Sequence, residues 1–244
     1  MRNLRLDLCY EGTRYRGWQR LSNTDNTIQA KLETTLTRIL GEPIEVSASG
    51  RTDAGTHARG QVVSFHCRSE MPCEEILSKL RCYLPEDIGI YSCKNASPRF
   101  HARLNAKTKT YVYRVWNSEA PCVFERKFVH IDSRELDIDL MRQAAQDFLG
   151  EHDFAAFCAN KNSKKSTVRY ILSFDVVRQG NEIGFTVTGN GFLHHMVRIM
   201  VGTLLEIGRG ERSADSIPDL FGGCRCETGE LIPACGLCLM EVTY

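Results

Sequence analysis

The order of the hydrophobic patterns is the feature that most constrains the fold of this chain. A strand pattern, a helix pattern and further strand patterns follow one another in the first half, and a similar order recurs in the second half. Strands and helices mixed in this way are typical of an α+β protein, here one built from two related halves. Because no low-complexity linker separates the halves, we expect them to pack together around a cleft, with the boundary between residues 96 and 109.

Alternation and helical spacing define the elements of the first half. Apolar residues alternate over 4–10, which predicts a half-buried strand. Asn26 is expected to cap a helix over 28–40, with Gln29 completing a capping box and Gly41 ending the helix. Further strands are expected over 44–49 and 61–67, and a second helix over 72–83.

The second half repeats the order. A strand over 111–116 precedes a helix over 137–149. Strands over 171–178 and 183–189 flank Gly180 and predict a hairpin. A strongly apolar helix is expected over 192–207, and a closing strand over 237–244.

Composition limits the class of protein and its compartment. The formal net charge of +1 excludes a uniformly basic nucleic-acid coat but allows local cationic patches. No stretch approaches the roughly 18 apolar residues that a membrane helix needs, and residues 1–10 do not form the apolar core of a signal peptide. Eleven cysteines, an odd number, are expected as reduced thiols. We therefore expect a cytoplasmic protein without a membrane segment.

The segment from Gly50 to Ala58 is the strongest candidate for chemistry. It places Asp53 between two glycines just after an expected strand, and a loop of this kind exposes a carboxylate to a substrate. Arg51, two residues away, favours the ionised carboxylate that a nucleophile or base requires. The alternative is a surface Asx turn with a salt bridge. An aspartic-protease site is excluded because no second equivalent loop exists.

Several segments, taken together and in order, resemble the TruA family of tRNA pseudouridine synthases. The resemblance spans essentially the whole chain, and the loop around Asp53 and the segment 192–198 are its most specific parts. The matching segments are Tyr10–Thr13, Gly17–Arg20, Gly50–Ala58, Gly60–Val63, Leu84–Ile88, Phe100–Arg103, Tyr111 with Tyr113, Gly150–Phe154, Phe192–Arg198 and Pro233–Leu237.

The resemblance implies an architecture as well as an activity. It implies an α+β fold of two ferredoxin-like halves, whose mainly antiparallel sheets join around a central basic, RNA-binding cleft. Residues 1–105 would carry the catalytic aspartate loop, and residues 106–244 would complete the active site and supply the contacts of a homodimer. No cofactor and no metal are implied. The implied substrate is the anticodon stem-loop of tRNA, at uridines 38, 39 and 40.

Catalytic roles are carried over from the resemblance residue by residue. Asp53 matches the essential aspartate of the family, which either attacks or deprotonates the substrate while the base is detached from N1 and rejoined through C5. Arg51 and Arg198 match active-site arginines. A guanidinium can hold a carboxylate bidentately or occupy the gap that a displaced base leaves.

Substrate-binding roles are implied in the same way. Tyr111 matches the tyrosine that stacks on the target uracil, and Leu237 matches an apolar residue beside the active site. Tyr113 is interpreted as an ordinary cross-strand aromatic residue, and a core role for Leu237 stays open.

Phosphate contacts would offset the cost of flipping a paired uridine out of its stem. Three clusters of cations offer such contacts, and we single out Arg103 and Lys109. The clusters are Arg14, Arg16 and Arg20; Arg99, Arg103, Lys107 and Lys109; and Lys161, Lys164, Lys165 and Arg169.

Three features of the chain depart from the family pattern, and other hypotheses stay open. Thr56 stands where most relatives carry valine, and Lys109–Thr110 stand where arginine is more frequent. Cys224, Cys226, Cys235 and Cys238 could ligate zinc, although their spacing departs from the usual paired pattern. The rival hypotheses are therefore a tRNA-remodelling relative without catalysis and a zinc-stabilised RNA-binding protein.

Overall fold

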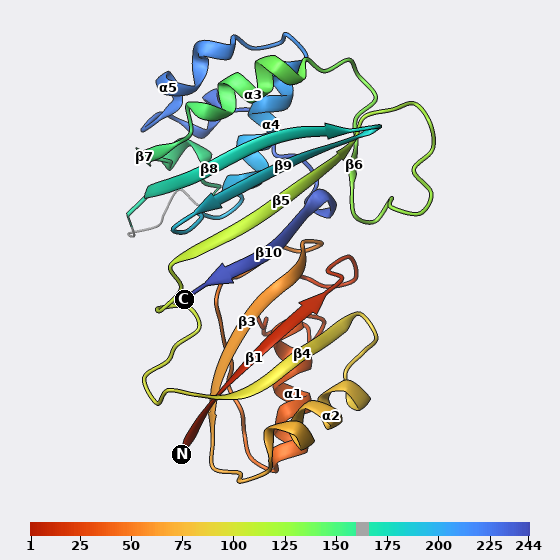
Figure 1. Cartoon of the computed structure of the whole chain (residues 1–244), viewed down its shortest axis with the longest axis vertical. Coiled ribbons are helices and arrows are strands. Elements are labelled where there is room, and N and C mark those ends of the chain that lie inside the picture. The colour runs from red at the N-terminus through yellow and green to blue at the C-terminus, as the bar shows by residue number, and fades with distance from the viewer. Residues whose placement is uncertain (160–165) are drawn as a thin grey trace. The chain divides into compact units, whose positions relative to one another are not determined.

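The computed structural model describes residues 1–159 and 166–244, which form a mixed α and β structure divided into two units (Figure 1). Unit 1 contains Met1–Lys107 and Leu239–Tyr244, and unit 2 contains Thr108–Cys238. The division made from the sequence, 1–105 and 106–244, gives the last six residues to the second half. These residues belong to unit 1, where the Lys107 N–H donates to the Thr243 carbonyl at 2.9 Å.

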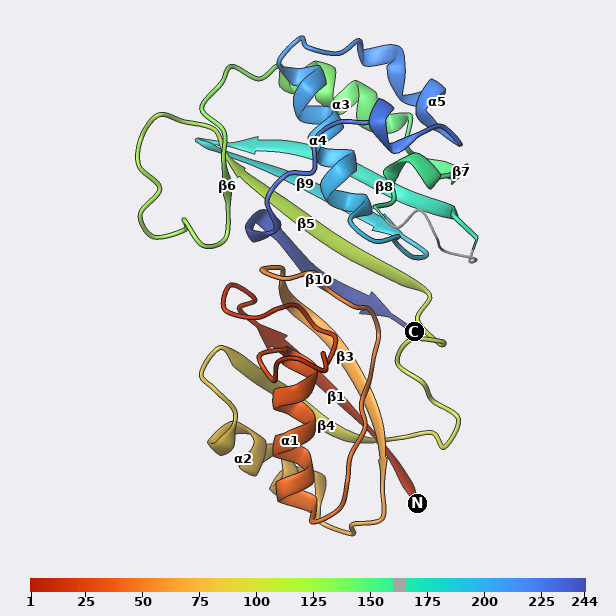
Figure 2. The same ribbon diagram turned by 180° about the vertical axis from the view of Figure 1, so that it is seen from behind.

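The sheet of unit 1 has the strand order β4 (Ile88–Ala96), β1 (Arg2–Tyr10), β3 (His57–Cys67) and β10 (Leu237–Thr243). The short β2 (Ser47–Ala48) pairs with β3. Strand β1 is antiparallel to both β3 and β4, with Leu6 opposite Val63 and Cys93. Leu4, Leu6 and Leu8 are fully buried, as the alternation predicted. Helices α1 (Ile28–Leu40) and α2 (Cys73–Tyr83) lie on one face of this sheet (Figure 2).

Helix α1 has the predicted bounds, but its cap lies one residue later than expected. Thr27, not Asn26, caps the helix, and its hydroxyl accepts a hydrogen bond from the Ala30 N–H at 3.3 Å. The Asn26 side chain instead donates to the Arg14 carbonyl at 2.6 Å, and Gln29 accepts from the Arg20 N–H at 3.0 Å. Both predicted cap residues therefore hold the preceding loop. Gly41 ends the helix in the left-handed conformation, as predicted.

Strand β4 is an element that the sequence patterns did not predict. A register shift against β1, between Asp7 and Leu8, interrupts its pairing. Ile88 and Ile90 are buried, but the next buried residue is Cys93, so the period of two is broken within the strand. A β-bulge of this kind hides a strand from an alternation test. The strand expected over 44–49 is reduced to the two residues of β2.

The sheet of unit 2 has the order β5 (Thr108–Trp116), β9 (Glu182–Gly189), β8 (Val168–Gln179) and β7 (Gly150–Asp153). The neighbours in this path are antiparallel, whereas the short β6 (His130–Ile131) is parallel to β5. The predicted hairpin is confirmed, because β8 and β9 pair antiparallel across a turn in which Gly180 has a positive φ of 59°.

Helices α3 (Ile138–Gln146) and α4 (Met196–Gly208) pack together in unit 2, and the short α5 (Ile217–Leu220) follows (Figure 2). Single 3₁₀ turns occur at Ala155–Phe157, Ala214–Ser216, Arg225–Glu227 and Ala234–Gly236. Helix α4 begins later than the expected residue 192, because His195 has a positive φ of 65°. Eleven of its thirteen residues are buried, so α4 forms the centre of the core of unit 2. No helix among the described residues is long and apolar enough to cross a membrane.

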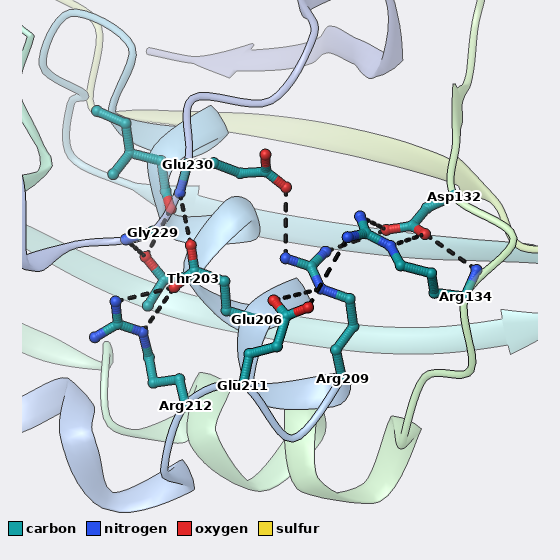
Figure 3. Close-up of polar contacts among 10 residues, drawn as sticks. Asp132, Arg134, Thr203, Glu206, Arg209, Glu211, Arg212, Gly229 and Glu230 are labelled. Atoms are coloured by element: carbon teal, nitrogen blue, oxygen red, sulfur yellow. Dashed lines mark hydrogen bonds and ion pairs between the residues drawn. The ribbon is translucent and has the colours of Figure 1, made fainter.

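A charged network fixes the C-terminal end of α4 (Figure 3). The guanidinium of Arg209 lies 3.2 Å from the Asp132 carboxylate and 3.5 Å from that of Glu230, and only 5% of the Arg209 side chain is exposed. Arg134 binds Asp132 at 2.7 Å. Burial raises the pKa of Asp132, but the hydrogen bonds and positive charge of Arg134 outweigh it and lower the pKa below its ordinary value.

Candidate active site

Asp53 lies in the loop that connects β2 to β3. Its side chain is half-buried, its neighbour Thr52 is buried, and Gly55 has a positive φ of 80°. The Thr56 N–H donates to the Asp53 carbonyl at 3.1 Å, which closes a tight turn around the aspartate. The loop therefore holds the Asp53 backbone in one conformation.

Polar side chains of strands β1 and β3 form hydrogen bonds with the loop. The hydroxyl groups of Tyr10 and Thr52 are 2.8 Å apart. The Gln61 amide nitrogen donates to the Gly50 carbonyl at 2.9 Å, while its amide oxygen accepts from the Ser49 hydroxyl at 2.6 Å. All these groups except Gly50 are buried, and buried hydrogen bonds of this kind fix a single arrangement. The ends of the loop are thus bonded to strands β1 and β3.

Close backbone contacts hold the loop from a second side. The Trp18 N–H donates to the Thr52 carbonyl at 3.0 Å, and a Cβ atom at Gly17 would lie 2.8 Å from the same carbonyl oxygen. A Cβ atom at Gly12 would lie 1.9 Å from the Thr56 carbonyl oxygen. These two glycines are required because no side chain fits between the two backbone segments.

Arg51 does not hold the carboxylate of Asp53. Its side chain is exposed, and it forms no ion pair or hydrogen bond within the part of the chain that the structure describes. Of the two uses that the sequence suggested for this arginine, the structure does not show the first, and its exposed side chain is accessible for the second, filling the gap that a displaced base leaves.

Two of the three arginines in the loop before α1 form ion pairs within unit 1. Arg14 pairs with Asp87 at 2.6 Å, and Arg20 pairs with Glu33 at 3.0 Å. Tyr15 also donates to Asp87 at 2.5 Å, and its pKa is raised by burial and by this hydrogen bond. Arg16 is exposed. The ion pairs explain Arg14 and Arg20 as anchors of their own loop, independent of any RNA.

Tyr111 lies in β5 of unit 2, opposite Val187 of β9. It is buried, and its ring meets that of Phe192 edge-on with centroids 5.1 Å apart. Tyr113, two residues on, is fully buried and donates from its hydroxyl to the Pro233 carbonyl at 2.7 Å. Tyr113 thus has a structural role, as the sequence interpretation proposed.

Arg198 lies in the first turn of α4. Its Nε–H donates to the Ile232 carbonyl at 2.8 Å, which orients the guanidinium. The segment that contains Ile232 lies tightly on α4, because a Cβ atom at Gly202 would be 2.1 Å from the Glu230 carbonyl oxygen. The Thr203 hydroxyl accepts from the Gly229 N–H at 3.0 Å (Figure 3). Helix α4 therefore sets the position of its own arginine and of the segment over 229–232.

Leu237 follows that segment at the start of β10 and is buried. A Cβ atom at Gly236 would lie 2.7 Å from the Arg114 carbonyl oxygen and 2.8 Å from the Tyr113 ring. Gly236 is therefore required for the close approach that places Leu237 beside β5.

The proposed RNA contacts fall in different environments. Arg103, Arg99 and Lys107 are exposed, and Lys109 is half-buried. Arg169 donates to the Ser166 and Val168 carbonyls, and burial lowers its pKa. The other members of its cluster, Lys161, Lys164 and Lys165, lie outside the described residues.

The four cysteines near the C-terminus do not form a common site. The sulfur atoms of Cys224 and Cys226 are 3.0 Å apart and exposed, whereas the Cys235 thiol donates to the Val129 carbonyl at 3.3 Å. Among residues 1–159 and 166–244, the four sulfur atoms do not gather with the spacing of metal ligands.

The supporting residues were the part of the site that the sequence did not identify. Tyr10, Thr52 and Gln61 stand in the segments that resemble the family, but nothing in the spacing gave them a role. Tyr10 and Gln61 could have been found as polar side chains within the expected strands over 4–10 and 61–67, whereas Thr52 lies in the loop and gave no such signal. Such residues are normally satisfied by hydrogen bonds, which here reach across 42 and 51 residues of sequence.

Comparison with known proteins gives consistent matches. A family model described as tRNA pseudouridine synthase matches residues 9–105 and 144–244. The chain is 41% identical over 245 residues to tRNA pseudouridine synthase A 2 of Bacillus cereus (strain ZK / E33L), and 42% identical to tRNA pseudouridine synthase A 1 of Clostridium tetani (strain Massachusetts / E88). Each alignment covers 100% of both proteins. Among solved structures, 97% of the chain aligns with 48% of a chain from a Cbf5–Nop10–Gar1 complex, at 12% identity and a TM-score of 0.39.

Proposed function

The chain belongs to the tRNA pseudouridine synthase family, and on this premise we propose which uridines it modifies and which residues act on them. As its motifs predicted, it is an isomerase that converts uridine to pseudouridine in tRNA. The proposed targets are uridines 38, 39 and 40 of the anticodon stem-loop. Asp53 is the proposed catalytic carboxylate, and the reaction needs no cofactor.

The chemistry explains why one fixed carboxylate is sufficient. The bond between uracil N1 and ribose C1′ breaks, and a bond between C5 and C1′ forms. The C5 proton leaves and N1 gains a proton, so the reaction is a balanced isomerisation. Asp53 acts either as a nucleophile or as a base, and both roles require a positioned carboxylate. The clamped loop, bonded through Thr52 and Gly50 to two strands, is the observation that carries this assignment.

Four further residues are proposed to act on the same nucleotide. Tyr111 stacks on the uracil, held by the edge of Phe192, and Leu237 supplies an apolar contact. Arg198 orients the reacting groups, supported by its hydrogen bond to the Ile232 carbonyl. Arg51, which is exposed, contacts the RNA where the base leaves its stack.

Arg103 and Lys109 are proposed phosphate contacts, and their charges offset part of the cost of base flipping. As the family resemblance implies, the enzyme is proposed to act as a homodimer in the cytoplasm. Its residues 1–105 carry the aspartate loop, and residues 106–244 supply Tyr111, Arg198 and Leu237.

Pseudouridine mapping tests the target positions. An unmodified tRNA with uridines at 38, 39 and 40 is incubated with the enzyme, and pseudouridines are located by base-specific chemical labelling. Three further transcripts replace one of these uridines each with cytidine. We expect labelling at the anticodon stem-loop, with each replacement removing one position. Labelling only outside residues 38–40 would refute the proposed target.

A further inference from the structure

The segment Ser97–Lys107, which we call the tip loop, is exposed along most of its length but tightly anchored in unit 1. The Asn3 side-chain amide donates to the Ser97 carbonyl at 2.8 Å and to the Phe100 carbonyl at 2.7 Å. Asn3 is itself buried. One side chain of β1 thus fixes the first turn of the loop.

The centre of the tip loop is bonded on both sides. Ala102 is fully buried; its N–H donates to the Ser64 hydroxyl at 3.0 Å, and its carbonyl accepts from the Tyr244 hydroxyl at 2.8 Å. The ring of Tyr244 also packs on Phe100, with centroids 5.0 Å apart. These bonds join the loop to β3 and to the last residue of unit 1.

The tip itself is built around His101. Its Nδ1 accepts hydrogen bonds from the N–H groups of Arg103 at 3.1 Å and Leu104 at 3.4 Å. The Asn105 side chain accepts from the His101 N–H at 2.7 Å. The result is a preformed turn in which Arg103 and Leu104 are exposed. Leu104 is 77% exposed, more than any other leucine among the described residues.

The charge of the tip loop indicates what covers Leu104. Between Ser97 and Lys107 the sequence contains no acidic residue, and its three cations are exposed: Arg99, Arg103 and Lys107. An exposed apolar side chain in a loop whose charged residues are all cations matches a nucleic acid, whose phosphates bind the cations while sugars and bases accept the apolar contact. A protein partner would need a matching acidic rim.

We propose that the tip loop is a preformed RNA-binding element in which Leu104 packs against the tRNA, Arg103 binds an adjacent phosphate, and His101 is a positioning residue for both. Because the turn is formed before binding, little conformational entropy is lost when the RNA is bound. The inference rests on tRNA as the substrate, but it depends neither on Asp53 nor on the position of the modified uridine.

The test compares Leu104→Ser and Arg103→Gln with the wild-type enzyme, using an unmodified tRNA transcript. Binding is measured at several salt concentrations, and turnover is measured at limiting tRNA. Leu104→Ser is expected to raise Kd, or to lower kcat/KM, about tenfold. The salt dependence of binding should stay unchanged. Arg103→Gln is expected to lower the slope of log Kd against log salt by about one. Leu172→Ser, at a 49% exposed position in β8, is the matched control.

The positioning role is tested separately. His101→Ala removes the acceptor of two backbone N–H groups, whereas His101→Asn can place an amide oxygen near the position of Nδ1. The alanine variant is expected to match the loss seen with Leu104→Ser, and the asparagine variant to restore most of it. Equal losses in the two variants would overturn the positioning role.

The outcomes separate this inference from the proposed target and catalytic residue. Wild-type turnover establishes activity, whatever the variants do. If Leu104→Ser matches both the wild type and Leu172→Ser in Kd and kcat/KM, the tip loop does not bind RNA through Leu104. A fall in the thermal midpoint of Leu104→Ser similar to that of a core substitution would show that Leu104 packs within the protein, and this would also overturn the inference.

Discussion

Asp53 is held by side chains and backbone groups that leave its loop little freedom. The glycines and the aspartate of the loop could be identified from the sequence, because their types and spacing are unusual. Tyr10 and Gln61, which support the loop, could not be assigned this role, because they lie on other strands and only the fold brings them beneath Thr52. Local patterns point to a candidate loop more readily than to the residues that stabilise it.

The structure shows that Thr56 lowers the stability of the protein, which its sequence context does not indicate. Among the described residues its buried hydroxyl has no hydrogen-bond partner. Thr56→Val should therefore raise the free energy of unfolding by about 1 kcal/mol, because valine keeps the shape of threonine and lacks the unsatisfied hydroxyl. Urea unfolding followed by circular dichroism measures the change.

Thr52→Val is the matched control for that prediction. It makes the same substitution four residues away, but it breaks the hydrogen bond to Tyr10. It should lower the free energy of unfolding by about 1 kcal/mol. Changes of the same sign in the two variants would contradict the account of this loop.

Helix α4 and the segment over 229–232 pack tightly on each other. The sequence predicted a long apolar helix here, but the fold begins it at Met196, and the left-handed His195 precedes it. Strand β4 and the true cap Thr27 were missed for related reasons: a bulge and a one-residue shift are settled by tertiary contacts, which the local pattern does not contain.

Gly236→Ala tests the close approach that positions Leu237. The new Cβ would collide with the Arg114 carbonyl, so we expect a loss of about 1–3 kcal/mol in stability and a lower kcat. Gly184→Ala in β9 is the control, because its Cβ would meet only the Val177 carbonyl at 3.9 Å. Urea unfolding and steady-state turnover measure the two effects. Equal behaviour of the variants would show that Gly236 is not required.

Asp132→Asn tests the network at the end of α4 through its pH dependence. The substitution leaves the buried Arg209 with only half-exposed carboxylates, and we expect a loss of about 3 kcal/mol at pH 7. The folded-state pKa of Asp132 is lowered, so its stabilisation is fully present above the unfolded pKa of about 3.9 and is lost as the pH falls through the lower folded value. The difference between wild type and variant in urea unfolding should therefore shrink from pH 5 to pH 3. A difference independent of pH would contradict this role.

The last six residues of the chain belong to unit 1, together with residues 1–107. Residues 239–244 contribute the end of β10 and the Tyr244 clamp to unit 1, a connection over more than a hundred residues that no local pattern indicates. The family and most of the longer elements were predictable from the sequence, because motifs and hydrophobic patterns along the whole chain carry them. The sequence did not indicate that the end of this last strand belongs to unit 1.

This return makes a prediction about fragments. A fragment of residues 1–107 lacks β10 and leaves an edge of β3 unpaired, so it should unfold at low urea or aggregate. The same fragment joined by a flexible Gly/Ser linker to residues 237–244 should unfold cooperatively at a higher urea midpoint. Equal midpoints would mean that the last strand does not stabilise unit 1.

Release of tritium from C5 of uridine in labelled tRNA tests the catalytic role of Asp53, since the C5 proton leaves only when the new carbon–carbon bond forms. Wild type, Asp53→Asn and Asp25→Asn, an exposed aspartate in the loop before α1, are compared under identical conditions. Asp53→Asn should bind tRNA as tightly as wild type but release tritium at least about a thousandfold more slowly, with Asp25→Asn unchanged. Release by a folded Asp53→Asn protein at a rate near that of the wild type would remove Asp53 from the mechanism.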